Sequence, residues 1–172
     1  EVLIFQPEEF LDHRGYLIES YNESVYKQFL PSINFVQDNE SKSSYGVLRG
    51  LHYQSDPYPQ AKLVRVVSGA IFDVVVDIRK SSPNFGKWVG IKLTHKNKKQ
   101  IWVPENFAHG FYVLEENTEV VYKTTDFYNS EEERSIKWDD KDISIRWPID
   151  TTPSLSSKDK EGTSLKKAEL PD

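Results

Sequence analysis

Three titratable side chains lie on strand-like segments that are otherwise mostly apolar. His52 lies in the segment VLRGLHYQ, Lys62 begins KLVRVV, and Tyr122 lies in EVVYKTT. Because side chains alternate across a strand, each of these groups shares a face with apolar neighbours. Together with Arg49 and Arg65, they are the set expected where a sheet lines a wet pocket. In such a pocket a histidine and a tyrosine could exchange protons with a substrate.

Each of these residues also has an ordinary structural explanation. A lone histidine is more often a hydrogen-bonded core or edge residue than a base, and a lone tyrosine is often a buried ring with a tethered hydroxyl. A lysine can extend its ammonium group to solvent, and Arg49 could close a salt bridge. The functional interpretation depends on their occurrence together in one small chain.

The residues and motifs that several other kinds of catalysis require are absent from the sequence. The chain has no cysteine, which excludes thiol nucleophiles, disulfides and zinc–thiolate sites. No Gly-x-Ser-x-Gly elbow, phosphate loop or dinucleotide glycine motif is present. The four histidines, His13, His52, His95 and His109, contain no His-x-His pair, although a three-ligand metal site built from distant strands stays open. We therefore expect acid–base catalysis with no metal and no cofactor.

The elements that must position these residues are short β-strands. Runs rich in Val, Ile, Tyr and Phe recur about every 8–12 residues, a spacing typical of a β-sandwich or barrel. The expected strands cover residues 1–7, 15–21, 34–39, 46–53, 61–68, 70–78, 87–93, 100–103, 109–114 and 119–125. Ser68–Gly69 is expected to form a hairpin turn.

One helix is expected outside the sheets. Asn22 can cap residues 23–30, with Val25, Phe29 and Leu30 on one face and Pro31 just beyond the end. From Asp150 onward the chain becomes polar, so this tail is predicted to be either a docked helical segment or partly disordered.

Length and charge limit the class of protein. A chain of 172 residues suits a single domain, residues 1–172. Because 27 acidic residues exceed 22 basic ones, a dedicated nucleic-acid surface is not expected. No apolar run reaches the roughly 20 residues of a membrane span, no signal-peptide pattern opens the chain, and cysteine is absent, so we expect a cytoplasmic protein. The missing initiator Met indicates a trimmed N-terminus.

Read in order, the motifs resemble a known family, the cupin-class dTDP-4-dehydrorhamnose 3,5-epimerases. Four segments carry the resemblance: residues 10–21 (FLDHRGYLIESY), 35–39 (FVQDN), 47–54 (VLRGLHYQ) and 103–111 (VPENFAHGF). Residues 122–128 (YKTTDFY) and 155–159 (LSSKD) support it. The combination is specific and covers the chain from about Val2 to Asp159.

The resemblance implies a jelly-roll β-sandwich and a set of site residues. It implies that His52 is the base with Asp159 as its partner, that Tyr122 is the acid on the opposite face of the sugar, and that Lys62 stabilises the enolate. Residues implied to bind the nucleotide-sugar are Phe10, Arg14, Glu19, Gln37, Asn39, Arg49, His109, Tyr128, Glu133 and Lys158. Tyr128 is implied to stack on thymine, and Arg14 and Glu19 to reach the neighbouring site of a homodimer.

The resemblance has departures, and other readings stay open. Ala61 replaces the glycine that usually precedes the lysine, and residues 160–163 (KEGT) replace the usual Ala-Pro after the aspartate. Asp73 also matches a pocket position, although it alternates with apolar residues along its strand. A C5-only or C3-only epimerase, a non-catalytic nucleotide-sugar-binding cupin and a metal-dependent cupin are the alternatives.

Overall fold

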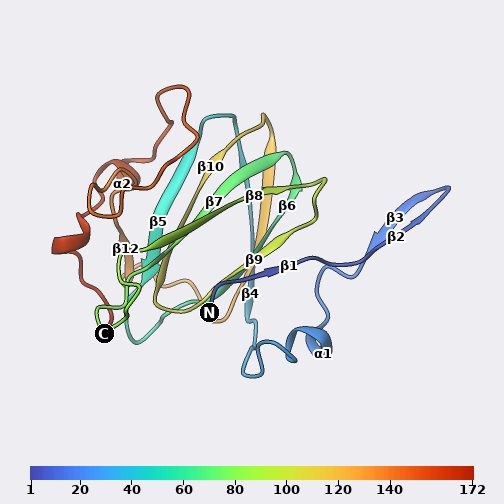
Figure 1. The fold of residues 1–172 in the computed structure, drawn as a ribbon, viewed down its shortest axis with the longest axis horizontal. Coiled ribbons are helices and arrows are strands. Elements are labelled where there is room, and N and C mark those ends of the chain that lie inside the picture. The colour runs from blue at the N-terminus through green and yellow to red at the C-terminus, as the bar shows by residue number, and fades with distance from the viewer.

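Two five-stranded antiparallel sheets face each other in the computed structural model, which describes residues 1–172 (Figure 1). The first sheet has the strand order β1 (Leu3–Phe5), β9 (Gln100–Val103), β6 (Lys62–Ser68), β11 (Thr118–Thr124) and β4 (Gln37–Ser43). The second has the order β12 (Glu133–Ser135), β5 (Leu48–Gln54), β10 (Phe107–Val113), β7 (Ala70–Asp77) and β8 (Trp88–Thr94). The predicted all-β, jelly-roll architecture is confirmed.

The remaining elements lie outside the two sheets. Strands β2 (Glu9–Asp12) and β3 (Gly15–Ile18) form a separate hairpin that projects from the body of the molecule (Figure 1). The helical elements are short: α1 (Glu23–Tyr26), α2 (Ser157–Lys160) and the 3₁₀ turn η1 (Leu165–Lys167). None of the helices has the length and apolar character needed to cross a membrane.

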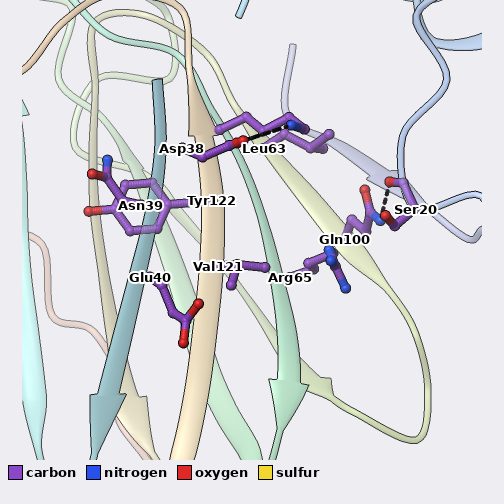
Figure 2. A pocket seen from close by; sticks show the side chains of 10 residues that line it. Ser20, Asp38, Asn39, Glu40, Leu63, Arg65, Gln100, Val121 and Tyr122 are labelled. Carbon is purple, nitrogen blue, oxygen red and sulfur yellow. Dashed lines mark hydrogen bonds and ion pairs between the residues drawn. The ribbon is translucent and has the colours of Figure 1, made fainter. Parts of the chain in front are cut away.

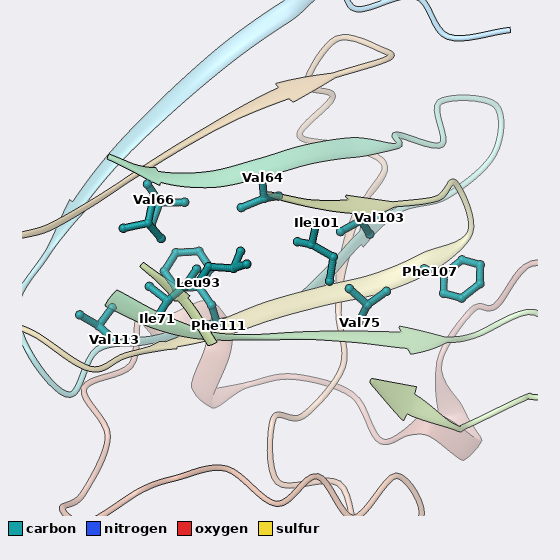
Figure 3. Packing of buried hydrophobic residues seen from close by; sticks show 11 residues of the cluster. Val64, Val66, Ile71, Val75, Leu93, Ile101, Val103, Phe107, Phe111 and Val113 are labelled. Carbon is teal, nitrogen blue, oxygen red and sulfur yellow. The ribbon is translucent and has the colours of Figure 1, made fainter. Parts of the chain in front are cut away.

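The space between the sheets is filled by aliphatic and aromatic side chains (Figure 3). Val64 and Val66 of the first sheet pack toward Ile71 and Phe111 of the second. These valines lie on the same face of β6 as Lys62, as strand alternation predicted. The strands that build the core therefore also carry the polar residues that line the pocket described below.

The expected helix over residues 23–30 is shorter than predicted. Asn22 caps it, accepting a hydrogen bond from the backbone N–H of Ser24 at 3.1 Å, but α1 ends at Tyr26. The buried residue is Tyr26, whereas Val25 and Phe29 are exposed. Tyr26 is buried by tertiary contacts: its ring stacks on Phe5, and its hydroxyl donates to Gln100 Oε1 at 2.9 Å.

Strand boundaries differ by a few residues, and two strands were not expected. The predicted strand over 34–39 is replaced by β4, which is polar on both faces: one face is exposed, and Gln37 and Asn39 on the other line the pocket described below. Strands β2 and β12 have no alternating apolar pattern and form because a partner strand is adjacent. The polar tail beyond Asp150 is docked, with a parallel bridge between Val47 and Ser154.

Gly69→Ala is expected to destabilise the fold by at least about 2 kcal/mol, because it adds a clash to a backbone that disfavours side chains. Gly69 forms the predicted turn between β6 and β7 with φ +78°, and an added Cβ would lie 2.2 Å from Thr118 Oγ1. Gly86 is the matched control, since it has φ +75° but its nearest neighbour, Leu165, would be 3.5 Å away. Gly86→Ala should cost about 1 kcal/mol. Urea unfolding of both variants measures the difference, and equal losses would contradict the steric argument.

Candidate active site

A cavity of about 120 Å³ receives side chains from both sheets. Its first-sheet residues come from β4, β6 and β11, and its second-sheet residues come from β5 and β12. The lining residues are Gln37, Asn39, His52, Tyr53, Gln54, Gln60, Lys62, Tyr122, Tyr128 and Glu133. Seven of the residues predicted from the sequence therefore line one cavity: Gln37, Asn39, His52, Lys62, Tyr122, Tyr128 and Glu133.

His52 forms a short hydrogen bond with Asp159. The distance from His52 Nε2 to Asp159 Oδ1 is 2.5 Å, and only 3% of Asp159 is exposed. Burial by itself would raise the pKa of Asp159, but hydrogen bonds from His52, Ser156 and the Gly50 backbone outweigh it and keep the pKa lowered. An ionised carboxylate fixes Nε2 as the protonated nitrogen, so Nδ1 of His52 is left as the free, basic atom.

Lys62 and Tyr122 come from neighbouring strands of the opposite sheet. The Lys62 ammonium lies 5.9 Å from the centre of the Tyr122 ring. Burial lowers the pKa of Lys62 to about 8, although the negative charges of Glu133 and Asp73 act in the other direction. Burial also raises the pKa of Tyr122, which keeps its hydroxyl protonated at neutral pH. The site thus presents a cation and a proton donor across from an imidazole.

A second histidine–carboxylate pair lies beside the first. His109 is directly opposite His52 in the β10–β5 ladder, and its Nε2 is 2.8 Å from Asp73 Oδ2. Both groups are buried, and desolvation raises the pKa of Asp73 against the effect of His109 and Lys62. Asp73 thus points into the sandwich with the residues of the site, on the strand face that also holds Ile71 and Val75.

A polar chain crosses one side of the cavity. Tyr128 donates its hydroxyl to Glu133 Oε2 at 2.8 Å, and Lys158 donates to Glu133 Oε1 at 2.6 Å. The Tyr128 backbone N–H donates to Gln37 Oε1 at 3.1 Å. Tyr128 is 55% exposed, so its ring is available to a ligand at the opening. This chain of contacts joins β4, β12, α2 and the segment between β11 and β12.

Sequence reasoning missed Tyr53, Gln54 and Gln60 as lining residues. Gln54 donates to the carbonyl oxygens of Tyr58 and Phe127, and Gln60 donates to that of Asp126. These glutamines hold the loops beside the cavity. Alternation along β5 could have identified Gln54, because it lies two positions after His52 and therefore shares its strand face.

Three predicted site residues lie away from this cavity. Phe10, Arg14 and Glu19 belong to the projecting β2–β3 hairpin or the residue that follows it, and none of them lines the cavity. Arg14 instead pairs with Asp12 on the same hairpin. Arg49, on β5, is exposed and donates to Ser43 Oγ at 3.1 Å.

A larger hollow of about 400 Å³ lies on the other face of the first sheet (Figure 2). Figure 2 shows Tyr122 and Asn39 on one side of the strands and Arg65 and Gln100 on the other. The outer hollow contains no histidine, and two of its charged side chains, Lys123 and Asp38, pair with each other at 3.0 Å. Of the two, the smaller cavity is the one that His52, Lys62 and Tyr122 line together.

No three His, Asp or Glu side chains converge in a way that could hold a metal ion. The two histidines of the site each contact one carboxylate.

Comparison with known proteins identifies the family of this chain. A family model described as dTDP-4-dehydrorhamnose 3,5-epimerase matches residues 1–167. The chain belongs to the dTDP-4-dehydrorhamnose 3,5-epimerase family. It is 57% identical over 163 residues to the enzyme of that name from Shigella flexneri, covering 94% of this chain and 90% of that relative.

Solved structures of the epimerase family share the fold. A dTDP-6-deoxy-D-glucose-3,5-epimerase from Legionella pneumophila, in complex with dTDP-4-keto-L-rhamnose, matches with a TM-score of 0.96 and 46% identity over 99% of this chain and 92% of that one. A 3'-monoepimerase from Streptomyces bikiniensis, in complex with dTDP-quinovose, matches with a TM-score of 0.94 and 32% identity over 99% and 88%. The same architecture therefore serves single and double epimerisation.

Lys62→Met is expected to stabilise the fold while removing the cation of the site. The folded protein holds the Lys62 proton less tightly than the unfolded chain, whose lysine has its ordinary pKa of 10.5. Wild-type stability should therefore rise between about pH 8 and pH 10.5. The variant should be more stable by on the order of 2–3 kcal/mol at pH 7, and the difference should vanish above about pH 10.5.

Urea unfolding across this pH range measures the effect. Lys96→Met replaces an exposed lysine and serves as the control, for which no such pH-dependent difference is expected. A difference for Lys62→Met that stays constant with pH would contradict the titration of Lys62 in the folded state.

Proposed function

We propose that this protein epimerises dTDP-4-dehydro-6-deoxy-D-glucose at C3 and C5, giving dTDP-4-dehydro-L-rhamnose by acid–base catalysis. The observation that carries the proposal is the arrangement of His52 and Tyr122, which come from opposite sheets and line the same cavity. Inversion at carbon needs a proton to leave one face and to return on the other. A base and an acid that face each other across a cavity suit that requirement.

The chemistry begins with the C4 keto group, which acidifies the protons on C3 and C5. We assign proton removal to His52 Nδ1, since Asp159 accepts the hydrogen bond from Nε2. Negative charge then develops on the C4 oxygen, and the Lys62 ammonium stabilises it electrostatically. Tyr122 delivers a proton to the opposite face of the carbon, and the two side chains return to their starting states by exchange with solvent.

Recognition of the nucleotide-sugar is assigned to the polar surroundings of the cavity. Tyr128 offers an exposed ring for stacking on thymine. Arg49 and Lys158 supply positive charge for the diphosphate, and arginine can bind phosphate oxygens in a bidentate manner. The other proposed contacts are Gln37, Asn39, His109 and Glu133. We further propose that residues 1–172 act as one domain, in which the segment after Asp150 delivers Asp159.

Phe10, Arg14 and Glu19 are proposed to act on the site of a second copy of the chain. The β2–β3 hairpin is exposed along nearly its whole length, with Leu11 74% and Leu17 63% exposed. An exposed apolar hairpin that leaves the body of the molecule fits a homodimer in which each hairpin covers its neighbour. Its residues could then complete a site that they cannot reach within their own chain.

Reaction in D₂O tests the proposed function. The product is expected to carry solvent deuterium at both C3 and C5, because the proton returned to each carbon comes from a group in exchange with solvent. NMR or mass spectrometry of the product locates the label, and His52→Asn should reduce incorporation at least about a hundredfold. Exchange at one carbon would indicate a C3-only or C5-only epimerase, and exchange at neither would refute the proposal.

Mixing two inactive variants tests the contribution of the second copy. His52→Asn and Arg14→Ala homodimers are each expected to lose activity, by at least about tenfold for Arg14→Ala. In a mixed dimer, one site has His52 from one chain and Arg14 from the other, so activity should recover toward half of wild type per dimer. Mixing after partial unfolding and refolding provides the exchange. Failure of the mixture to recover activity, with mixed dimers present, would place Arg14 in its own chain's site.

A further inference from the structure

The carboxylate that holds His52 is itself held by a serine. Asp159 is the third residue of α2, and Ser156 is the residue that caps this helix. The Ser156 hydroxyl donates to Asp159 Oδ2 at 2.9 Å and accepts from the Asp159 backbone N–H at 3.1 Å. One hydroxyl can do both, because it has one proton to donate and lone pairs to accept.

The two oxygens of Asp159 therefore have different partners. Oδ1 accepts the 2.5 Å hydrogen bond from His52 and a longer one, at 3.4 Å, from the Gly50 backbone N–H. Oδ2 accepts from Ser156. With one oxygen fixed by the serine, rotation of the carboxylate about its last bond is restricted, and Oδ1 stays directed at the imidazole.

The helix by itself is too short to provide this rigidity. α2 contains four residues, and isolated helices of that length are unstable. Its flanks are held to the second sheet: Leu48 N–H donates to the Ser154 oxygen at 3.0 Å, and Lys137 N–H donates to the Thr163 oxygen at 3.0 Å. Between these anchors, the Asp159 carboxylate is oriented by the hydrogen bond that the Ser156 hydroxyl donates to it.

We propose that Ser156 is a positioning residue for the epimerisation, acting through Asp159 on the orientation of His52. This inference rests on the proposed acid–base function. Ser156 touches neither the cavity nor His52, so its effect should fall on the rate of proton transfer and not on substrate affinity. It has two separable properties, the cap that its oxygen provides and the hydrogen bond that its proton provides.

Four variants separate these properties. Ser156→Thr keeps both cap and donor, Ser156→Ala loses both, and Ser156→Asp keeps a favoured cap but loses the donor at neutral pH. Ser157→Ala, at the exposed neighbouring position, is the matched control. We expect kcat to fall about tenfold in the Ala and Asp variants with KM changed less than about twofold, and to stay near wild type in the other two. If Ser156→Asp has wild-type kcat, capping alone is sufficient and the proposal is overturned.

A spectroscopic readout keeps the test independent of activity. The Nε2 proton of His52 should give a downfield proton NMR signal, recognised by its loss in His52→Asn. That signal should shift or broaden in the Ala and Asp variants and persist in Ser156→Thr and Ser157→Ala. An unchanged signal in both the Ala and Asp variants would refute the positioning role, even if wild type proves inactive on the keto-sugar. Inactive wild type with the expected NMR pattern would instead refute the proposed function alone.

Discussion

The hydrogen bond between His52 and Asp159 joins residues 107 positions apart, and much of the structure is arranged around it. A nearly buried carboxylate is costly unless hydrogen bonds replace its water, and here they come from two segments, β5 and the residue that caps α2. His52 is supplied by β5, and the Gly50 N–H belongs to the same strand. Asp159 arrives from the opposite end of the chain, so the tail must dock before the pair can form.

Core and site share the same strands. On β6, Val64 and Val66 pack in the sandwich while Lys62, on the same face, meets the cavity. On β11, Val120 is in the core and Tyr122 is in the cavity. Because the strands are anchored by apolar packing at one end, the polar residues further along are held in fixed relative positions. The cost is a half-buried ammonium group, whose pKa is lowered by lost hydration.

Sequence reasoning was accurate where local pattern decides the structure and failed where a distant contact decides it. Alternation along β6 and β11 predicted which residues share a face with Lys62 and Tyr122, and the turn at Gly69 followed from its residue type. The helix after Asn22 was predicted too long: it ends at Tyr26, whose ring packs on Phe5, and residues 27–29 continue as turns. Strands β2 and β12 were not predicted, since they have no strand pattern of their own and are extended because they pair with β3 and β5.

By itself, the sequence determined the all-β class, the absence of thiol chemistry and, through ordered motifs, the family. Those properties depend on composition and on short-range periodicity, which the chain carries locally. Tertiary structure decided which of the candidate residues meet. It brought seven of them into one cavity, paired Asp73 with His109, added Ser156 behind Asp159, and left Phe10, Arg14 and Glu19 outside. Such contacts join residues far apart along the chain, and their distances depend on how two sheets and a docked tail pack together.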